Sequence, residues 1–199
     1  MMMKLTFDCS LAEKARILEL TWVAVNHEPY DVGLFNRIPQ VMPDGTLRFS
    51  PDLAWIERDL SGTLRVALRA LTIPKGLRMT AQVPPQCSRI APGASHREVT
   101  RLALPVIEMH PYKRAVLAGA TPGEITADVP LHAARLSFTL GAFAVVGDVH
   151  LSSEHPAFPE VWSPTPRAIA GQDLFVRDFD LARPIDVLGY RVTPWPCAR

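Results

Sequence analysis

The chain has 199 residues, 48% of them hydrophobic and 21% charged, and its 21 basic and 20 acidic side chains leave a net charge of +1. This balance is typical of a folded globular protein and differs from the composition of disordered chains. Because no broad positive field is present, binding to nucleic acids or to anionic membranes is disfavoured. The composition therefore directs attention to protein and small-molecule partners.

The location of the protein is inferred from its termini, apolar runs and cysteines. No sustained apolar run follows Lys4, so a signal peptide is not predicted. The longest weakly polar run, residues 136–147, is shorter than the roughly 20 residues that a membrane-spanning helix needs. Cys9, Cys87 and Cys197 are far apart and odd in number, which disfavours a disulfide framework or zinc ribbon. We expect a cytoplasmic protein without a membrane association.

The first predicted element combines two patterns. Ser10 and Glu13 have the spacing of a helix-capping box, and the apolar residues between positions 11 and 18 lie near one helical stripe. The pattern then changes to strict alternation. We therefore expect at most one or two turns of helix before a strand that begins near Arg16.

Three strands are predicted most clearly, because apolar and polar residues alternate in them with a period of two. They cover residues 17–25, 62–71 and 134–146. Their apolar faces are expected to be buried. These faces hold, in chain order, Leu18, Leu20, Trp22 and Ala24; Leu64, Val66, Leu68 and Ala70; and Leu136, Phe138, Leu140 and Ala142.

Shorter apolar runs, bounded by Gly, Pro and Asp, predict further strands. Turn signals separate them at residues 42–46, 91–95 and 121–124, where a proline stands one or two positions before a glycine that tolerates positive φ. The 19 prolines are spread along the chain, which suits many strands joined by fixed turns. The further predicted strands are residues 32–38, 46–50, 51–59, 77–83, 96–109, 172–181 and 185–192.

These elements predict an all-β protein with an immunoglobulin-like antiparallel β-sandwich of about seven to ten short strands. The Cys…Trp…Cys pattern of antibody domains is missing, so only the architecture is predicted. No polar linker divides the chain, and we expect one domain over residues 1–199. Its core strands are expected at about 16–112, with additional strands at about 113–199.

A resemblance covers roughly the first 112 residues. The succession LTWVAVNHEPYDVGLFNRI, DGTLRF, LRVAL and IAPGASHREVTRLALPVIEMHPY is similar to a class of uncharacterised bacterial proteins with immunoglobulin-like sandwiches. The shared features are an Asn-containing turn after the first core strand and a Pro-Gly turn before a strand with a proline-rich exit. The resemblance implies a fold and assigns no catalytic residue.

Three histidines stand where predicted strands end, and each is followed by proline and an aromatic ring. They are His27 in HEPY, His110 in HPY and His155 in HPAF. Imidazoles gathered in this way could bind a transition metal or line a small-ligand rim. The alternative is structural: proline ends the strand, the ring covers the core, and histidine is the polar residue at the boundary.

Two of these histidines would meet if their strands run in the same direction, as the second and sixth strands of an immunoglobulin-like sandwich do. Residues 16–26 and 97–109 would be those strands. Both exits would then lie at one end of the sandwich, with Tyr30 and Tyr112 as contacts for a partner or ligand.

Two tryptophans lie in proline-rich segments near the C-terminus. Trp162 follows a valine in VWSPTP, and Trp195 stands in PWPCAR. An exposed indole is a flat contact for a partner or a sugar. The alternative is that both rings fold back as lids over the sandwich.

Three other patterns carry both a functional and a structural interpretation. Residues 148–155 hold two histidines and two acids, which could form a metal site in a loop or a solvated loop. Residues 177–186 hold three aspartates, which could bind calcium or protect an edge strand from aggregation. Arg89 could lower the pKa of the Cys87 thiol, or the cysteine could be structural.

Motifs for nucleophilic catalysis and nucleotide binding, GxSxG, GxGxxG and Walker A, are missing from the sequence. We therefore expect a non-catalytic module that binds a protein partner or itself through a sheet edge or loops. The first alternative is a small-ligand or transition-metal module that uses His27, His110 and His155. The second is an enzyme whose site is assembled from loops.

Overall fold

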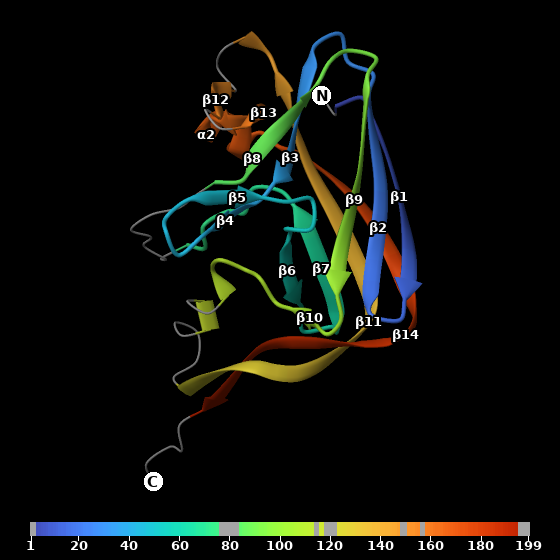
Figure 1. The fold of residues 1–199 in the computed structure, drawn as a ribbon, viewed down its shortest axis with the longest axis vertical. Coiled ribbons are helices and arrows are strands. Elements are labelled where there is room, and N and C mark those ends of the chain that lie inside the picture. The colour runs from blue at the N-terminus through green and yellow to red at the C-terminus, as the bar shows by residue number, and fades with distance from the viewer. Residues whose placement is uncertain are drawn as a thin grey trace.

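The computed structural model describes residues 3–75, 84–113, 116–117, 123–147, 151–155 and 158–194. The chain is mostly β, with multiple antiparallel sheets and a short helix (Figure 1). Its elements are β1 (Leu5–Lys14), β2 (Ile17–Asn26), β3 (Asp31–Arg37), β4 (Pro39–Val41), β5 (Leu47–Phe49), β6 (Trp55–Arg58), β7 (Thr63–Leu68), β8 (Gln86–Ile90), β9 (Ser95–Ala103), β10 (Val106–Ile107), β11 (Gly123–Val145), β12 (Leu151–His155), β13 (Phe158–Pro164), α2 (Pro166–Ala170) and β14 (Asp173–Pro194).

The smaller layer is a three-stranded antiparallel sheet in the order β1-β2-β9. β1 and β2 form a hairpin in which Lys14 is paired with Ile17. The helical turns predicted around residues 10–15 are therefore wrong, because the strand Leu5–Lys14 runs through this region. Pairing with β2 satisfies the backbone of the segment, and the same strand packs Phe7 against Phe138 of the larger sheet. These tertiary gains outweigh the local capping signal.

The larger layer is a nine-stranded sheet in the order β10-β14-β11-β3-β8-β13-β12, with β7 paired to β11 and β6 paired to β7. Most of its pairs are antiparallel. The β7–β11 and β10–β14 pairs are parallel, unlike the purely antiparallel arrangement predicted from the sequence. The hairpin of β4 and β5 forms a separate two-stranded sheet.

Two strands are far longer than the short strands predicted. β11 has 23 residues and β14 has 22, and they pair with each other along their lengths. Their pairing passes two register shifts, between Thr126 and Val129 and between Ala133 and Arg135. Such irregularities let a strand bend without ending. Beyond the layered part, both strands curve away as a two-stranded ribbon (Figure 1).

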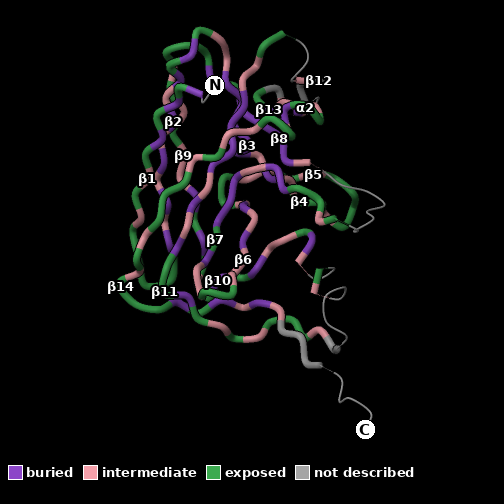
Figure 2. The backbone as a smooth tube through the Cα atoms, turned by 180° about the vertical axis from the view of Figure 1, so that it is seen from behind, coloured by how far each residue is buried: buried purple, intermediate pink, exposed green. Residues whose placement is uncertain are grey.

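The core lies between the two layers. Phe138 of β11 has its ring centroid 5.9 Å from that of Phe7 and 6.4 Å from that of Trp22, so it contacts the smaller sheet. Buried and less buried positions alternate along β2, whereas β3 is buried almost throughout (Figure 2). The predicted buried faces of residues 17–25, 62–71 and 134–146 are confirmed, since their twelve apolar positions are at most 2% exposed.

The remaining predicted elements agree with the structure in part. Gly45 and Gly93 have φ of +82° and +72°, as the turn signals require. Residues 51–59 contain β6, and residues 96–109 are divided into β9 and β10 on either side of a cis Leu104–Pro105 peptide. The predicted strand 77–83 lies outside the described residues. Among the described helices, none is long and apolar enough to cross a membrane.

Candidate functional site: a groove on the outer face of the larger sheet

The outer face of β6, β7, β11 and β14 carries side chains in rows that the strand registers define. In the middle row, Trp55 is level with Ala67, Ala67 with Thr139, and Thr139 with Val176. The row beside it holds charged and polar residues: Glu57, Arg65, Ser137 and Asp178. One row is therefore largely apolar and its neighbour is charged.

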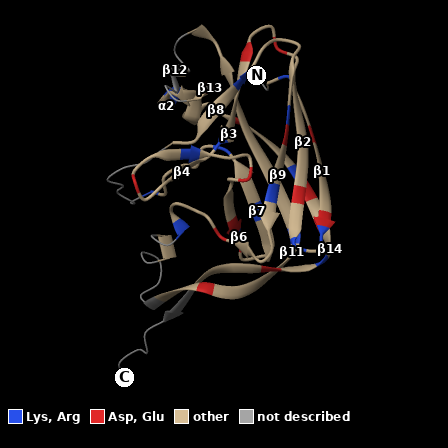
Figure 3. Ribbon diagram, in the orientation of Figure 1, with Lys and Arg blue, Asp and Glu red and all other residues tan. Residues whose placement is uncertain are grey.

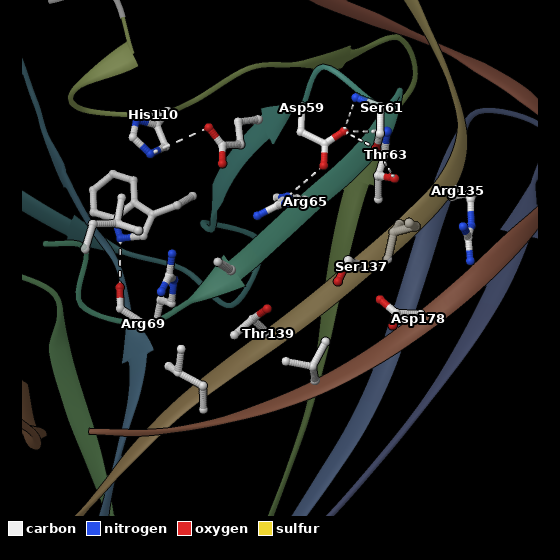
Figure 4. Close-up of a pocket in the computed structure, with 17 residues that line it drawn as sticks. Asp59, Ser61, Thr63, Arg65, Arg69, His110, Arg135, Ser137, Thr139 and Asp178 are labelled. Carbon is white, nitrogen blue, oxygen red and sulfur yellow. Dashed lines mark hydrogen bonds and ion pairs between the residues drawn. The ribbon is translucent and has the colours of Figure 1, made fainter. Parts of the chain in front are cut away.

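A groove of about 460 Å³ follows these rows along β11. Its floor is low because the central positions carry small side chains, Ala67, Ser137 and Thr139. Trp55, Arg65 and Arg69 form one wall, and Leu174, Val176 and Asp178 form the other. Figure 4 shows Arg65 and Arg69 on the opposite side of Ser137 and Thr139 from Asp178. The hollow is thus a direct result of small residues on two central strands and large residues on the strands beside them.

Near Arg69, the space above Gly141 is filled by neighbouring side chains. A Cβ atom at this position would lie 2.6 Å from Gln172 Oε1 and 2.8 Å from the Cβ of Arg69, so no side chain fits there. Gln172 is held in place because its Nε2 donates to the carbonyls of Ala70 and Ile169, at 2.9 and 3.1 Å. The groove therefore has a fixed wall beside Arg69.

Two of the three arginines that line the groove are paired with acids. Arg65 Nε lies 2.9 Å from Asp59 Oδ2, and Arg135 Nε lies 3.2 Å from Asp180 Oδ1. Burial alone would raise the pKa of Asp59, but hydrogen bonds from Ser61 and Thr63 and the charge of Arg65 lower it to about 2. In each pair, the carboxylate balances the charge of the arginine.

Arg69 is the third arginine, and within the described part of the chain its guanidinium has no ion-pair partner. Its backbone carbonyl accepts a hydrogen bond of 3.0 Å from Trp55 Nε1. Burial lowers the pKa of Arg69, the charge of Glu57 raises it, and that of Arg65 lowers it. An arginine stays protonated through such a change, so the groove contains a partly desolvated cation without a fixed counter-ion.

His110 lies at the rim of the groove near Glu57. Its Nδ1 accepts a hydrogen bond of 3.2 Å from the backbone N–H of Tyr112, and its Nε2 faces Glu57 Oε2 at 3.9 Å. Burial lowers the pKa of His110; the nearby acids raise it and the nearby cations lower it. The Nδ1 contact requires the neutral Nε2–H tautomer, so neither ring nitrogen is free to act as a base.

Below this rim, the carboxylate of Glu108 joins three segments. It accepts hydrogen bonds from the backbone N–H groups of Arg58, at 2.6 Å, and Tyr190, at 3.1 Å, and it is ion-paired with Lys113. The Glu108 side chain is fully buried. Its role is structural, because the Arg58 and Tyr190 contacts tie β6 and β14 to the segment that carries His110, and the Lys113 contact balances the buried charge.

A second polar cluster lies between the two layers, away from the groove. Asn36 Nδ2 is 3.0 Å from both His96 Nε2 and Glu98 Oε2, and its Oδ1 accepts from the N–H of Ser88 at 3.1 Å. Glu98 is also ion-paired with Arg37. Because these groups form hydrogen bonds and an ion pair with one another, we interpret the cluster as a contact that holds the two layers together.

His27 and His110 do not share one end of the molecule. β2 and β9 are antiparallel neighbours, with Val25 opposite Ser95 and Ile17 opposite Ala103. The predicted parallel direction of residues 16–26 and 97–109 is therefore wrong, because the two strands are joined edge to edge within one sheet. His27 leaves β2 beside the N-terminus, and the chain reaches His110 only beyond the far end of β9 (Figure 1).

The predicted metal ligands are accounted for individually. His27 Nε2 shares a hydrogen bond of 2.8 Å with Thr6 Oγ1 on the neighbouring strand. The side chain of His155 lies outside the described residues, as does His150. In the described part of the chain, no three His, Cys, Asp or Glu side chains are grouped as metal ligands.

The segment around His27 is a junction built from its polar residues. Asn26 Nδ2 donates to the carbonyls of Tyr30 and Ile90, and its Oδ1 accepts from the N–H of Glu28. Glu28 in turn accepts from the N–H of Lys4 at 2.6 Å. Asn26 and Glu28 are buried, so the cluster satisfies backbone groups where β2 ends.

The predicted aromatic contacts have different surroundings. Tyr112 is 1% exposed, so its ring belongs to the interior, and it lies edge-on to His110 at 5.9 Å between centroids. Tyr30 is partly exposed at the junction. Trp162 is partly buried and packs under Arg89, whose guanidinium carbon lies 5.5 Å from the ring centroid. Trp195 lies outside the described residues.

The described cysteines are poor nucleophiles. Burial raises the pKa of Cys87 to about 12, and the pKa of Cys9 is likewise raised to about 12 by burial, against the lowering effect of Arg177. Cys87 Sγ donates to the carbonyl of Trp162 at 3.2 Å. The interpretation in which Arg89 lowers the thiol pKa is wrong, because Arg89 is paired with Asp31 and burial dominates.

Sequence reasoning did not find the groove. The signal was present in residues 62–71, where Arg65 and Arg69 flank Ala67 on the polar face of a predicted strand. Whether these residues line a groove depends on which strands lie beside β7, and only the tertiary structure shows those neighbours. Charges of both signs are spread over the described strands, so composition offers no further guide (Figure 3).

Comparison with known proteins adds no family. No family model matches the chain, and neither the curated proteins nor the solved structures contain a significant match. The function must therefore be argued from the geometry of the site.

Proposed function

We propose that this chain is a non-catalytic binding module that holds an extended segment of a protein partner in the outer-face groove. The observation that carries this proposal is the groove itself: a hollow of about 460 Å³ in which an apolar row lies beside Arg69, a cation without an ion-pair partner among the described residues. Leu174 and Val176 in its wall are 45% and 44% exposed, which leaves apolar surface for a partner to cover.

The dimensions of the groove support a peptide. From Arg65 to Arg69 along β7 the backbone advances roughly 13 Å, at about 3.3 Å per residue. An extended segment of about four residues spans the same length. The open upper side admits such a segment along β11, with its side chains directed toward the apolar row.

A binding role accounts for the groove better than catalysis does. The ring nitrogens of His110 face Tyr112 and Glu57, and Asp59 is held by Arg65. In the described contacts, the hydroxyls of Ser137 and Thr139 donate to no imidazole or carboxylate that would activate them. The groove thus offers recognition groups, and two of its titratable residues, His110 and Asp59, are held in structural contacts.

The proposal is tested with a substitution that fills the groove. Purified protein is titrated with a library of short peptides, and binding is followed by fluorescence polarisation. Ser137→Trp places a large ring on the floor of the groove, and Ser95→Trp makes the same change at an exposed position on the smaller sheet. We expect Ser137→Trp to abolish binding and Ser95→Trp to retain it, with both variants folded by circular dichroism. Equal binding by the two variants, or no peptide bound by the wild type, would refute the proposal.

The finer description of the fold is also a proposal. We propose that the two layers form an immunoglobulin-like sandwich within one domain of residues 1–199, and that the protein is cytoplasmic. Face-to-face packing supports the sandwich, and a core shared by Trp22 and Phe138 supports one domain. The free thiols of Cys9 and Cys87 support a reducing compartment.

A further inference from the structure

We propose, on the basis of the binding role above, that the groove recognises a free carboxylate attached to an aliphatic side chain, as at the C-terminal residue of a peptide, with Arg69 as the carboxylate receptor. Three features near Arg69 support this proposal: a cation, an aliphatic wall and a glutamine side chain that lies across β11.

The cation is Arg69. Its guanidinium presents a planar fork that matches the two oxygens of a carboxylate. Its backbone is fixed by the Trp55 hydrogen bond on one side and by the close approach of Gly141 on the other. The neighbouring Arg65 is neutralised by Asp59. Glu57, the acid that acts on Arg69 electrostatically, also faces His110 at 3.9 Å. Arg69 is therefore the arginine of this groove that has no ion-pair partner among the described residues.

The aliphatic wall lies across β11 from this cation. Leu174 is level with Gly141, and Val176 is level with Thr139. Strands β7 and β14 are separated by β11, so their backbones are roughly 10 Å apart at about 4.8 Å per strand spacing. A carboxylate bound to Arg69 would thus leave room for the attached side chain to cover Leu174 and Val176. Covering them removes apolar surface from water, which favours an aliphatic residue.

The glutamine that lies across β11 favours a chain terminus over a segment that continues. Gln172 stands at this end, and its side chain makes hydrogen bonds to both the N–H and the carbonyl of Ala70. Gln172 and the Cβ of Arg69 occupy the space above Gly141, and from this we infer that a peptide lying along β11 ends near Arg69. A terminal carboxylate would then lie beside a guanidinium that has no ion-pair partner among the described residues.

The test compares acid and amide. One probe is a pool of fluorescent tetrapeptides with three randomised residues and a C-terminal leucine that ends in a free carboxylate. The second is the same pool with a C-terminal amide, and the third is N-acetyl-leucine as a competitor. For wild type we expect the acid pool to bind at least tenfold more tightly than the amide pool, and N-acetyl-leucine to compete only at concentrations at least tenfold higher.

Variants at Arg69 test whether the preference for the acid pool depends on the charge of this side chain. Arg69→Gln should reduce the preference for the acid pool to less than threefold, and Arg69→Lys should keep part of it because the charge remains. Arg97→Gln, the same change at an exposed position of β9, should keep the wild-type preference. Thermal unfolding of each variant checks that the groove is intact.

The outcomes distinguish this inference from the proposed function. Equal affinity for acid and amide, with binding still abolished by Ser137→Trp, overturns the carboxylate receptor and leaves the binding role standing. Equal affinity for N-acetyl-leucine and the acid pool assigns the site to small carboxylic acids and overturns the peptide terminus. Failure of Ser137→Trp to affect any probe overturns both proposals.

Discussion

Trp55 and Arg69 are joined by a hydrogen bond of 3.0 Å from the indole Nε1 to the backbone carbonyl oxygen. The indole thereby forms one wall of the groove and also fixes Arg69, a cation that has no ion-pair partner among the described residues. The two residues are 14 apart in sequence; Trp55 begins β6, and Arg69 directly follows β7, its antiparallel neighbour. The shape and the charge of the groove are therefore coupled through one contact.

Replacing Trp55 with Phe tests this coupling. The variant keeps an aromatic wall and loses the N–H donor, so we expect the free energy of unfolding to fall by about 1 to 2 kcal/mol. The preference for the acid pool over the amide pool should also fall, because the backbone of Arg69 is less well fixed. Urea unfolding and fluorescence polarisation measure the two effects. An unchanged preference would show that the indole does not position Arg69.

Replacing Glu108 with Gln tests the buried contact below the rim. The change leaves the Lys113 ammonium without its ion partner and weakens the acceptor for the N–H groups of Arg58 and Tyr190. We expect a loss of about 3 kcal/mol in the free energy of unfolding, as for other broken buried pairs. Asp180→Asn, which removes an acid from the exposed pair with Arg135, should leave the urea midpoint unchanged. Equal effects of the two changes would contradict the structural role of Glu108.

The pH dependence of stability tests Asp59. Its pKa is lowered from 3.8 to about 2 in the folded protein, so its carboxylate contributes stability above the unfolded pKa. This contribution is lost as the pH falls through the folded pKa. The difference in stability between wild type and Asp59→Asn should thus be largest above pH 4 and should shrink between pH 4 and pH 2. Urea unfolding at pH 5, 3.5 and 2.5 measures this difference, and a constant difference would argue against the contacts of Asp59.

The reactivity of the thiols tests the burial of Cys9 and Cys87. Both have a pKa raised to about 12, so the nucleophilic thiolate is scarce at neutral pH in the folded protein. We expect iodoacetamide to alkylate both at least tenfold more slowly in the native protein than in urea. Mass spectrometry of peptides resolves each site. Rapid native labelling of Cys87 would mean that its thiol is more accessible than its contact with the Trp162 carbonyl indicates.

Much of the secondary structure was predictable because it depends on local pattern. The alternation in residues 17–25 and 62–71 identifies which side chains face inward, whatever the partner strand is. Turns at Gly45 and Gly93 were predictable for the same reason, since positive φ is a local requirement. The capping signal near Ser10 was misleading because a strand partner outweighed it.

The candidate site was not predictable, since its residues are distant in sequence. Arg69, Gly141 and Leu174 form one end of the groove only because β11 lies between β7 and β14. The proposed pairing of His27 with His110 failed for a related reason. It required a strand direction that hydrogen-bonded registers decide, and no local pattern encodes that direction.

By itself, then, the sequence determined an all-β chain with defined inward faces, because alternation and turn chemistry act over a few residues. The tertiary structure alone decided the parallel pairing of β7 with β11 and the extension of the predicted strand 134–146 back to Gly123. It also decided the merging of the predicted strands 172–181 and 185–192 into β14, and the placement beside an exposed aliphatic wall of an arginine that has no ion-pair partner in the described part of the chain. These features depend on which strands become neighbours. That choice is made by the packing of the whole core, in which each strand's partner is selected by the apolar surface and backbone hydrogen bonds of the others.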